Sequence, residues 1–255
     1  MAFSATHIGT ATLLLEIGPL RILTDPAFDP PGRTYGFGWG TSSKRTAGPA
    51  LPLEQIGHLD AVLITHDQHA DNLDDAGRTL LPRAAHLVTT PAAARRLGHS
   101  GAVGLKPFES TTVGDVRITA TPARHGPPGS LPIVGHVVGF LLESPSLPGP
   151  VYISGDTVWF DGVAEVARRF RVHTAFLHLG CVGFPLTGPL RYTFNAREAV
   201  VAAQALGAQR IVPVHYDGWT HFRQGPDEAR RELTRAGLAD RVTWLTPGER
   251  TSLDG

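Results

Sequence analysis

The chain has 255 residues, which is enough to bury a large core as one α/β domain or as two fused halves. Apolar residues make up 42% of it and charged residues 18%, a globular composition that excludes a disordered chain. Because 23 basic residues balance 23 acidic ones and no dense Lys/Arg run occurs, a surface that binds nucleic acid is not expected.

The expected cellular setting follows from three sequence features. Cys181 is the only cysteine, so no internal disulfide can form, which fits a reducing compartment. The first residues lack a basic segment and Glu16 interrupts their apolar stretch, so a strand is predicted there and not a signal peptide. No apolar run approaches the ~20 residues that a membrane span needs. We therefore expect a cytoplasmic protein.

The first half of the chain is predicted to alternate strands with short helices. A hairpin turns at Gly18-Pro19, and a continuous apolar run leads directly into the polar segment 66–75. The Gly- and Pro-rich segment 25–52 is expected to form a long loop, whose aromatic residues, Trp39 among them, either pack in the ordinary way or wall a pocket. The expected strands are 11–17, 20–24, 61–65 and 86–90. The expected helices are one of about two turns that ends near Pro82 and one at 91–97.

The second half repeats this order of a hairpin, strands and strand–helix units. Gly114-Asp115 is predicted to turn the hairpin, and Asn195 with Glu198 resembles a capping box that starts a helix. The resulting prediction is a single domain of two similar halves, roughly 1–110 and 111–255, with two sheets face to face and helices outside. The expected strands are 111–113, 116–121, 136–143, 151–154, 174–179, 211–215 and 242–245, and the expected helices are 159–170, 196–206 and 227–236.

Four polar clusters directly follow predicted strands. Ligands gather at the carboxyl ends of strands in α/β sheets, so these clusters are candidates for one common site. Their histidine and carboxylate side chains form a ligand set suited to zinc, manganese or iron, without thiolates. The clusters are 65–72, 122–126, 154–157 and 213–217, and their candidate ligands are His66, His69, Asp71, His125, Asp156 and His215.

The order of these clusters resembles the metallo-β-lactamase superfamily, whose first motif is normally T/S-H-x-H-x-D-H. The segment 65–72, THDQHADN, is a variant of that motif, and the match extends from about His7 to Trp219. The residues 7–12 and 23–26 are similar to the opening hairpin of the branch that includes ascorbate-6-phosphate lactonase-like and N-acylphosphatidylethanolamine phospholipase D-like proteins. The resemblance implies a four-layer αβ/βα sandwich.

The resemblance also implies a role for each candidate ligand. His66, His69 and His125 would form a first metal site. Asp71 and His215 would serve a second metal, with Asp156 as the bridging carboxylate.

Two departures from the family motif put the number of metal ions in question. His66 and His69 are separated by two residues instead of one, and Asn72 stands where the third motif histidine belongs. An amide oxygen is a weaker and harder ligand than imidazole, so one ion, or two with manganese in the second position, are both open. Asp67 or Gln68 is an alternative donor in the place of the missing third histidine.

The ligand set predicts a hydrolase. A divalent metal with an open position lowers the pKa of bound water, which favours attack by metal-bound hydroxide on a small ester, lactone or phosphoester. Asp71 is expected to orient that water and to take its proton. A metal-binding sensor without catalysis is the alternative. Possible substrate contacts are Arg124, His221 and Trp39, whereas His178 and Cys181 are expected to be buried structural residues.

Overall fold

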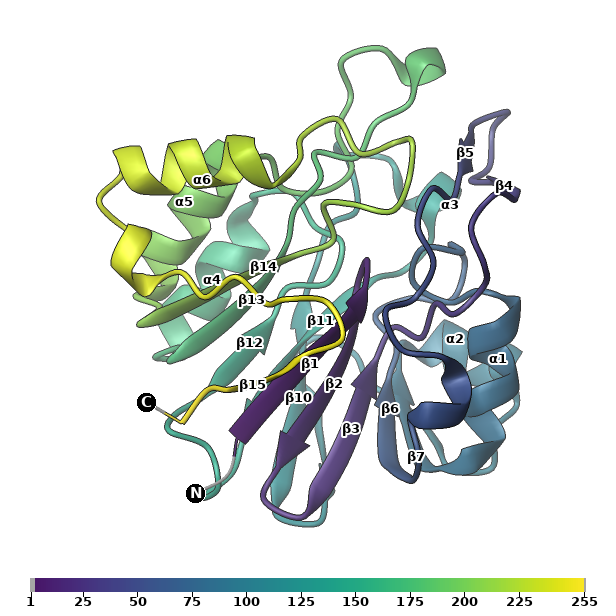
Figure 1. The fold of residues 1–255 in the computed structure, drawn as a ribbon, viewed down its shortest axis with the longest axis vertical. Coiled ribbons are helices and arrows are strands. Elements are labelled where there is room, and N and C mark those ends of the chain that lie inside the picture. Colours follow the sequence, from purple (N-terminus) through teal and green to yellow (C-terminus); the bar gives the residue numbers. More distant parts are fainter. Residues whose placement is uncertain (1–2, 255) are drawn as a thin grey trace.

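Two β-sheets packed face to face form the centre of the molecule, as seen in a computed structural model that describes residues 3–254 (Figure 1). The first sheet has seven strands in the order β15-β1-β2-β3-β6-β7-β8, and the second has six in the order β14-β13-β12-β11-β10-β9. A separate two-stranded hairpin, β4-β5, lies in the long loop after β3. Helices cover the outer face of each sheet, as expected for the αβ/βα architecture.

The first sheet is built mainly from the first 104 residues. Its strands β3, β6, β7 and β8 are parallel, and α1 and α2 connect them over its outer face. The elements in this part are β1 (Phe3–Gly9), β2 (Thr12–Ile17), β3 (Leu20–Thr24), β4 (Thr34–Gly36), β5 (Ser42–Lys44), β6 (Leu59–Leu63), α1 (Asp75–Leu80), β7 (Ala84–Thr89), α2 (Pro91–Leu97) and β8 (Ala102–Gly104).

The second sheet follows along the chain. Its elements are β9 (Ser110–Val113), β10 (Val116–Pro122), α3 (Leu131–Val134), β11 (Val138–Glu143), β12 (Val151–Ile153), α4 (Asp161–Arg169), β13 (Thr174–His178), α5 (Ala196–Leu206), β14 (Arg210–Val214) and α6 (Pro226–Arg235). The last strand, β15 (Arg250–Ser252), returns to pair with β1 in the first sheet, so the expected second half, 111–255, contributes to both sheets.

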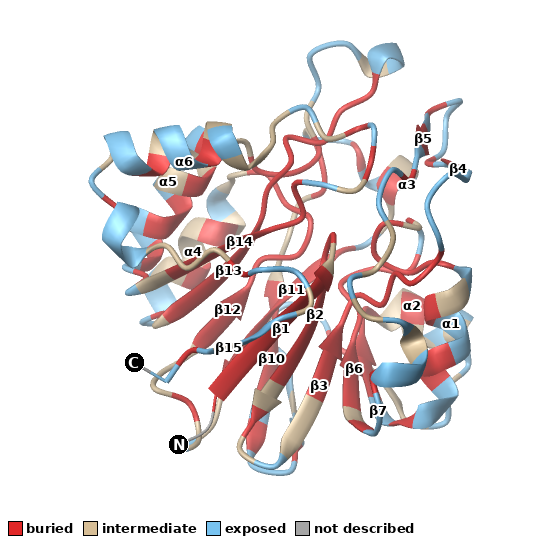
Figure 2. Cartoon of the chain, viewed as in Figure 1, coloured by how far each residue is buried: buried red, intermediate tan, exposed pale blue. Residues whose placement is uncertain are grey.

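Alternation along the strands explains the layers. Leu13 and Leu15 of β2 point into the core between the sheets, where they meet residues such as Phe140 of β11, while Leu14 points outward to the helices of the first sheet. Figure 2 shows the consequence, with buried strands inside and exposed outer faces on the helices. Burial of apolar surface from water is the main stabilising contribution of these layers.

Helix α5 shows how local sequence sets an element. The Asn195 side chain accepts a hydrogen bond from the Glu198 amide, which confirms the predicted capping box, and Gly207 ends the helix in a left-handed conformation with φ of 62°. Between these ends, the small and apolar residues that face the second sheet are buried; they are Ala196, Ala199, Ala202, Ala203 and Leu206.

Several expectations about the elements were wrong. No strand forms at 242–245, where a single isolated bridge joins Val242 to Ile211. The strands β4, β5, β8 and β15 and the short helix α3 were not expected, and β1 was not expected as a strand separate from the one predicted at 11–17. Most of them are only three or four residues long, and β15 is polar, so periodicity carries little signal in them. Within residues 3–254, no helix combines the length and apolarity that crossing a membrane requires.

A buried ion pair between Arg45 and Asp74 connects the long loop 25–52 to the rest of the fold. The Arg45 guanidinium, 1% exposed, donates to Asp74 Oδ2 at 2.6 Å and to the carbonyl of Ala27 at 2.9 Å. Asp74 also caps the start of α1, because its Oδ1 accepts from the Gly77 amide at 2.8 Å. One arginine thus joins the loop to the helix that follows the segment 65–72.

We expect the substitution Arg45→Met to lower the free energy of unfolding by roughly 3–5 kcal/mol, because it leaves the buried Asp74 carboxylate without its cation. Urea unfolding followed by circular dichroism measures this change. The control is Arg33→Met, since Arg33 also pairs with an aspartate, Asp75, but on the exposed surface. Equal stability of the two variants would contradict an anchoring role for Arg45.

Candidate metal centre

The six candidate ligands all lie on loops that leave strands at one edge of the two sheets. His66, His69 and Asp71 follow β6 of the first sheet. The other three come from the second sheet and follow β10, β12 and β14; they are His125, Asp156 and His215. All six side chains are buried. The structure therefore brings together every residue of the predicted ligand set.

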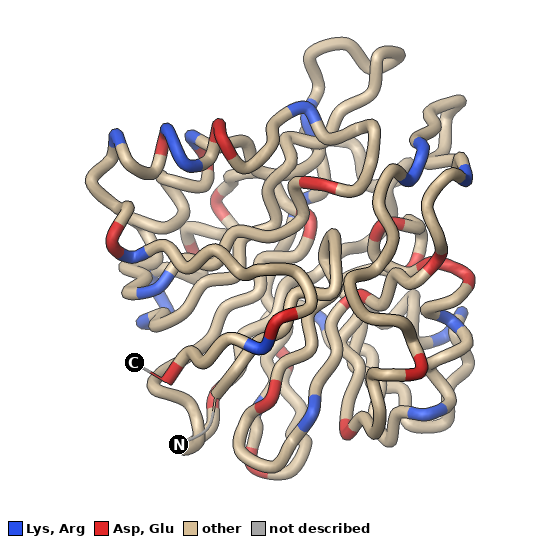
Figure 3. The backbone as a smooth tube through the Cα atoms, viewed as in Figure 1, with Lys and Arg blue, Asp and Glu red and all other residues tan. Residues whose placement is uncertain are grey.

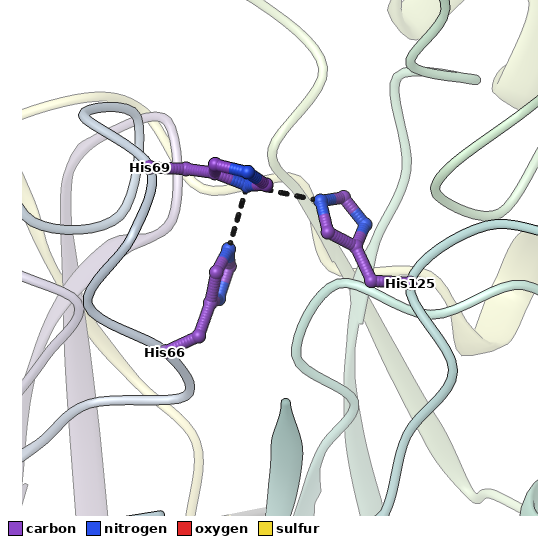
Figure 4. A group of neighbouring side chains, drawn as sticks. All are labelled: His66, His69 and His125. Atoms are coloured by element: carbon purple, nitrogen blue, oxygen red, sulfur yellow. Dashed lines mark hydrogen bonds between the residues drawn. The ribbon is translucent and has the colours of Figure 1, made fainter. Parts of the chain in front are cut away.

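Three imidazoles converge in the first group (Figure 4). His66 Nε2 lies 3.1 Å from His69 Nδ1, and His125 Nε2 lies 3.1 Å from the same atom. Tetrahedral zinc with Zn–N bonds near 2.0–2.1 Å separates its nitrogen ligands by about 3.3 Å. The spacing of these nitrogens suits a single ion, and the extra residue between His66 and His69 does not prevent their convergence.

Neighbouring groups set the tautomers of two of these histidines. His125 Nδ1 lies 2.7 Å from the carbonyl oxygen of Tyr192, so it carries the proton and donates it, which leaves the Nε2 lone pair free. His66 Nδ1 lies 3.0 Å from Thr65 Oγ1, and the Thr65 hydroxyl also lies 3.0 Å from Asp25 Oδ1. This chain of contacts orients the His66 ring from behind.

Burial keeps these imidazoles neutral. It lowers the pKa of His125 to about 3, with proximity to His69 as the next cause, and it also lowers the pKa values of His66 and His69. A neutral imidazole offers the lone pair that a metal needs.

The second group contains two carboxylates and one imidazole. His215 Nε2 lies 3.4 Å from Asp71 Oδ2, and His215 Nδ1 lies 3.6 Å from Asp156 Oδ1. Burial raises the pKa of Asp156. Burial has the same tendency at Asp71, but contacts with His215 and His221 outweigh it and hold the pKa of Asp71 well below its usual range. A carboxylate at neutral pH is therefore expected at Asp71.

The unpartnered atoms of this group test whether a metal fits. Both oxygens of Asp156, Asp71 Oδ1 and both ring nitrogens of His215 are buried and make no hydrogen bond within the described chain. Buried polar atoms without partners are costly, and a cation satisfies several of them at once. The donor set of each group suits a divalent ion, which agrees with a metal-dependent protein.

The sequence left three residues as alternative donors in the place of the missing motif histidine, and the structure places them differently; they are Asp67, Gln68 and Asn72. Asp67 forms an ion pair with Arg96 and the Gln68 side chain is exposed, so neither of these residues joins the ligand groups. Asn72 is fully buried, its amide nitrogen donates to Thr65 Oγ1 at 3.2 Å, and its oxygen has no partner in the described residues. Of the three alternatives, only Asn72 is placed beside the centre.

The three residues predicted as possible substrate contacts lie in three different places in the structure. His221 Nε2 lies 3.1 Å from Asp71 Oδ2, and its ring stacks on Trp219 at a centroid distance of 5.6 Å. Trp39 lines the pocket described below, whereas Arg124 lies over the Phe160 ring in a neighbouring cleft. His221 thus contacts the candidate ligand Asp71 directly. In the sequence, the aromatic residues that flank His221 indicated a place near the site.

Sequence reasoning missed the supporting residues behind the ligands. Asp25 is fully buried, adopts a left-handed φ of 40°, and accepts from the Thr65 amide at 2.8 Å. His178 is buried as expected, and Ser154 Oγ lies 3.2 Å from its Nδ1. His215 itself has φ of 59° and donates its amide to the Thr10 carbonyl. Unusual backbone conformations gather at functional sites, but no residue type in the sequence reveals them.

A pocket of about 350 Å³ opens onto the centre. His69, Asp71 and His125 form part of its lining, together with Phe37 and Tyr192. Phe37 belongs to a buried aromatic cluster that also contains Tyr35, Phe184, Tyr192 and Trp219. The aromatic loop predicted at 25–52 therefore supplies both ordinary packing and a wall of this pocket.

Comparison with known proteins gives results that agree with this geometry. A family model described as beta-lactamase superfamily domain matches residues 20–216. A metal-dependent hydrolase of Desulfitobacterium hafniense is 31% identical over 210 residues, covering 77% of this chain and 82% of the relative. A metal-dependent hydrolase of Pyrobaculum aerophilum is 26% identical over 248 residues, covering 94% and 96%.

Solved structures show the same fold. The crystal structure of an isothiocyanate hydrolase from Delia radicum gut bacteria superposes with a TM-score of 0.84 at 22% identity, covering 99% of this chain and 100% of that one.

We expect purified protein to retain a divalent ion and the variant His69→Ala to lose it, because His69 contacts both other histidines of the first group. Elemental analysis counts the ions per chain. Chelation should lower the melting temperature of the wild type, since an ion at 100 times its Kd adds about 2.7 kcal/mol of stability. His86→Ala, which removes an exposed histidine on β7, is the control and should leave ion content unchanged. Equal ion content in the two variants would disprove this assignment.

Proposed function

The chain belongs to the beta-lactamase superfamily and to its metal-dependent hydrolases, and from this premise we propose that it hydrolyses a small ester or lactone at the two ligand groups. The observation that carries the proposal is the convergence of three imidazoles, with nitrogens of His66 and His125 each 3.1 Å from His69 Nδ1. Two of them, His69 and His125, line the pocket. The second group, Asp71, Asp156 and His215, supplies the rest of the donor set. Both oxygens of Asp156 and Oδ1 of Asp71 have no hydrogen-bond partner in the described chain. We further propose that one domain carries the whole site.

A bound divalent ion would lower the pKa of water to near neutrality and polarise the oxygen of the bond to be cleaved. His66, His69 and His125 would hold the first ion. Asp71, Asp156 and His215 would hold a second, and the family resemblance implies that Asp156 would be the carboxylate shared by both ions.

Asp71 is positioned to guide the attacking water. Its Oδ2 faces His215 and His221, while its Oδ1 has no partner in the described chain and the residue lines the pocket. The low pKa keeps Asp71 ionised, so Oδ1 can accept a hydrogen bond from water. In the net reaction the water oxygen bonds to the carbonyl carbon, the bond to the alcohol oxygen breaks, and the alcohol leaves with one proton from the water.

The metal content follows from Asn72. We propose that the three-histidine group binds zinc or manganese more tightly than the second group, where an amide takes the place of the usual histidine. Iron suits the same ligand types. A harder ion such as manganese is favoured in the second position because its donors are mainly oxygens.

Two alternatives deserve direct comparison with ester hydrolysis. A metal-binding sensor is motivated by the variant motif at 65–72. Hydrolysis of an isothiocyanate is motivated by the similar fold of the isothiocyanate hydrolase and by the apolar pocket, since that group is uncharged. Both are distinguished from the leading proposal by supplying esters, lactones, phosphodiesters and isothiocyanates to the metal-loaded protein.

We expect Asp71→Asn to reduce kcat for the best ester or lactone by about 10²–10⁴-fold, the range for loss of a general base. Steady-state kinetics measures this change, and circular dichroism confirms the fold. Asp75→Asn, an exposed carboxylate on α1, serves as the control and should keep full activity. Turnover unaffected by Asp71→Asn would remove Asp71 from the reaction, and absence of turnover on every substrate would favour the sensor.

Titration of metal-free protein with zinc or manganese tests the order of binding. Calorimetry should resolve a tight first ion and a weaker second. His125→Ala should abolish the tight step, whereas His215→Ala should abolish only the weak one, because the two histidines belong to different groups. Two equally tight ions in the wild type would contradict the role given to Asn72.

A further inference from the structure

Three chain segments wall the pocket above the metal centre, and all three present apolar side chains. The β4–β5 hairpin contributes Phe37 and Trp39, α3 contributes Val134, and the segment 182–192 contributes Phe184 and Leu186. In Figure 1 the hairpin and α3 lie close together at the top of the first sheet. The floor, with His69, Asp71 and His125, holds the ionisable histidine and carboxylate side chains of the lining, and the walls add the hydroxyls of Thr41, Thr187 and Tyr192.

The rim of this pocket exposes large apolar side chains to water. Five large hydrophobic residues are exposed in the described chain, and three of them line this pocket: Trp39 (74%), Leu186 (69%) and Leu190 (42%). A fourth, Leu131 (50%), lies on α3 but lines the neighbouring cleft. The fifth, Val201, lies on α5. Exposed apolar groups gathered in one place mark an interaction site, because covering them removes apolar surface from water.

The hairpin tip that carries Trp39 is held in an unusual conformation. Gly38, Trp39 and Gly40 all have positive φ, at 86°, 52° and 75°. A bulky residue rarely adopts this region, so the two glycines and the hydrogen bond from the Thr41 amide to the Gly38 carbonyl hold the indole at the tip. A Cβ placed on Gly40 would lie 3.5 Å from Leu186, so the tip also approaches the segment 182–192.

The described lining of the pocket carries no positive charge, although Lys44 of β5 and Arg191 of the segment 182–192 belong to the chain segments that form its walls. No Lys or Arg occurs among the described residues that line the pocket, and Figure 3 shows no charged residue on the loop 185–190. Two nearby cations have partners elsewhere: Arg191 pairs with Glu198 at 2.7 Å, and Arg223 donates to the Phe184 carbonyl at 2.7 Å. Three others line a different cleft that shares His125 and Val134 with the pocket; they are Arg95, Lys106 and Arg124. A bound ion would attract one oxygen of any ester, but an anionic group elsewhere on the substrate would find no partner in these walls.

We propose that this pocket selects a neutral substrate whose reactive carbon carries a compact aromatic or branched alkyl group. The inference rests on the proposed hydrolase function and names its substrate class. The volume of about 350 Å³ is near the lower end of the ~300–1,000 Å³ found for small-molecule sites, which suits a compact group. Substrates with a carboxylate remote from the reacting group are disfavoured, because that charge would be desolvated without a counter-charge.

A matched pair of esters tests the charge preference. The metal-loaded protein is given 4-nitrophenyl phenylacetate and the same ester with a carboxylate on the distal ring position, so the leaving group is identical. We expect kcat/KM to be on the order of 100-fold higher for the neutral ester, mainly through KM, given the cost of burying an unpaired charge. Equal kcat/KM for the two esters would overturn the proposed substrate class while leaving hydrolysis intact.

Two variants test whether residues of the pocket walls cause the preference for the neutral ester. Leu186→Arg adds a cation at the rim. It should reduce the ratio of kcat/KM for the neutral ester to kcat/KM for the charged ester at least several-fold. Val201→Arg adds the same charge at the exposed residue of α5 and should leave the ratio unchanged. A ratio that both variants alter equally would overturn the role of the rim.

Binding of unreactive ligands separates failure of the proposal from failure of the function. Neutral phenylacetamide and its carboxylate-bearing counterpart are titrated while tryptophan fluorescence is followed, with Trp39→Phe as the variant that should lose the signal. Preferential binding of the neutral amide without turnover of any ester would retain the substrate class and reject the hydrolase function. Equal binding of the two amides would reject the substrate class itself.

Discussion

The burial of two carboxylates and four imidazoles at the junction of two sheets is the constraint on which the structure depends. Such groups are stable away from water only when a cation or a full set of hydrogen bonds satisfies them. The sheets supply the position, because strand ends from both meet there. The surrounding residues supply orientation: Thr65 and Asp25 stand behind His66, and the Tyr192 carbonyl holds His125. The apolar walls of the pocket lie above the same point.

The sequence predicted the main sheets, and it named the six candidate ligands that the structure brings together, because both leave local signals. Apolar runs mark the strands, and polar residues at their carboxyl ends mark the common edge. Three-residue strands such as β15 and β8 leave almost no signal, since pairing with a distant strand defines them. The pairing of Arg45 with Asp74, 29 residues apart, is invisible for the same reason. Asp67 illustrates the opposite error: a carboxylate beside the ligand histidines faces Arg96 instead.

The variant motif shows where sequence and structure complement each other. The sequence identified Asn72 as the place where a usual histidine is missing. The structure adds that Asn72 turns its amide nitrogen toward Thr65, and that His221, from the loop after β14, contacts Asp71. Imidazole therefore still faces the second group, but from the other sheet. His221 lies 149 positions after Asn72 in the sequence. Its place beside the second group depends on packing against Trp219 and Phe37, and only the folded chain defines this packing.

The origin of the ligands from both sheets has a mechanical consequence. An ion held by His66 and His69 together with His125 would join residues from two separately built layers, much as a cross-link does. This chain has one cysteine and therefore no covalent bridge of its own. The ion would restrict how far the sheets can slide or part at their open edge, and its loss would free the loops there before the apolar core between the sheets gives way. Metal supply would then govern the resistance of the protein to proteases as well as its chemistry.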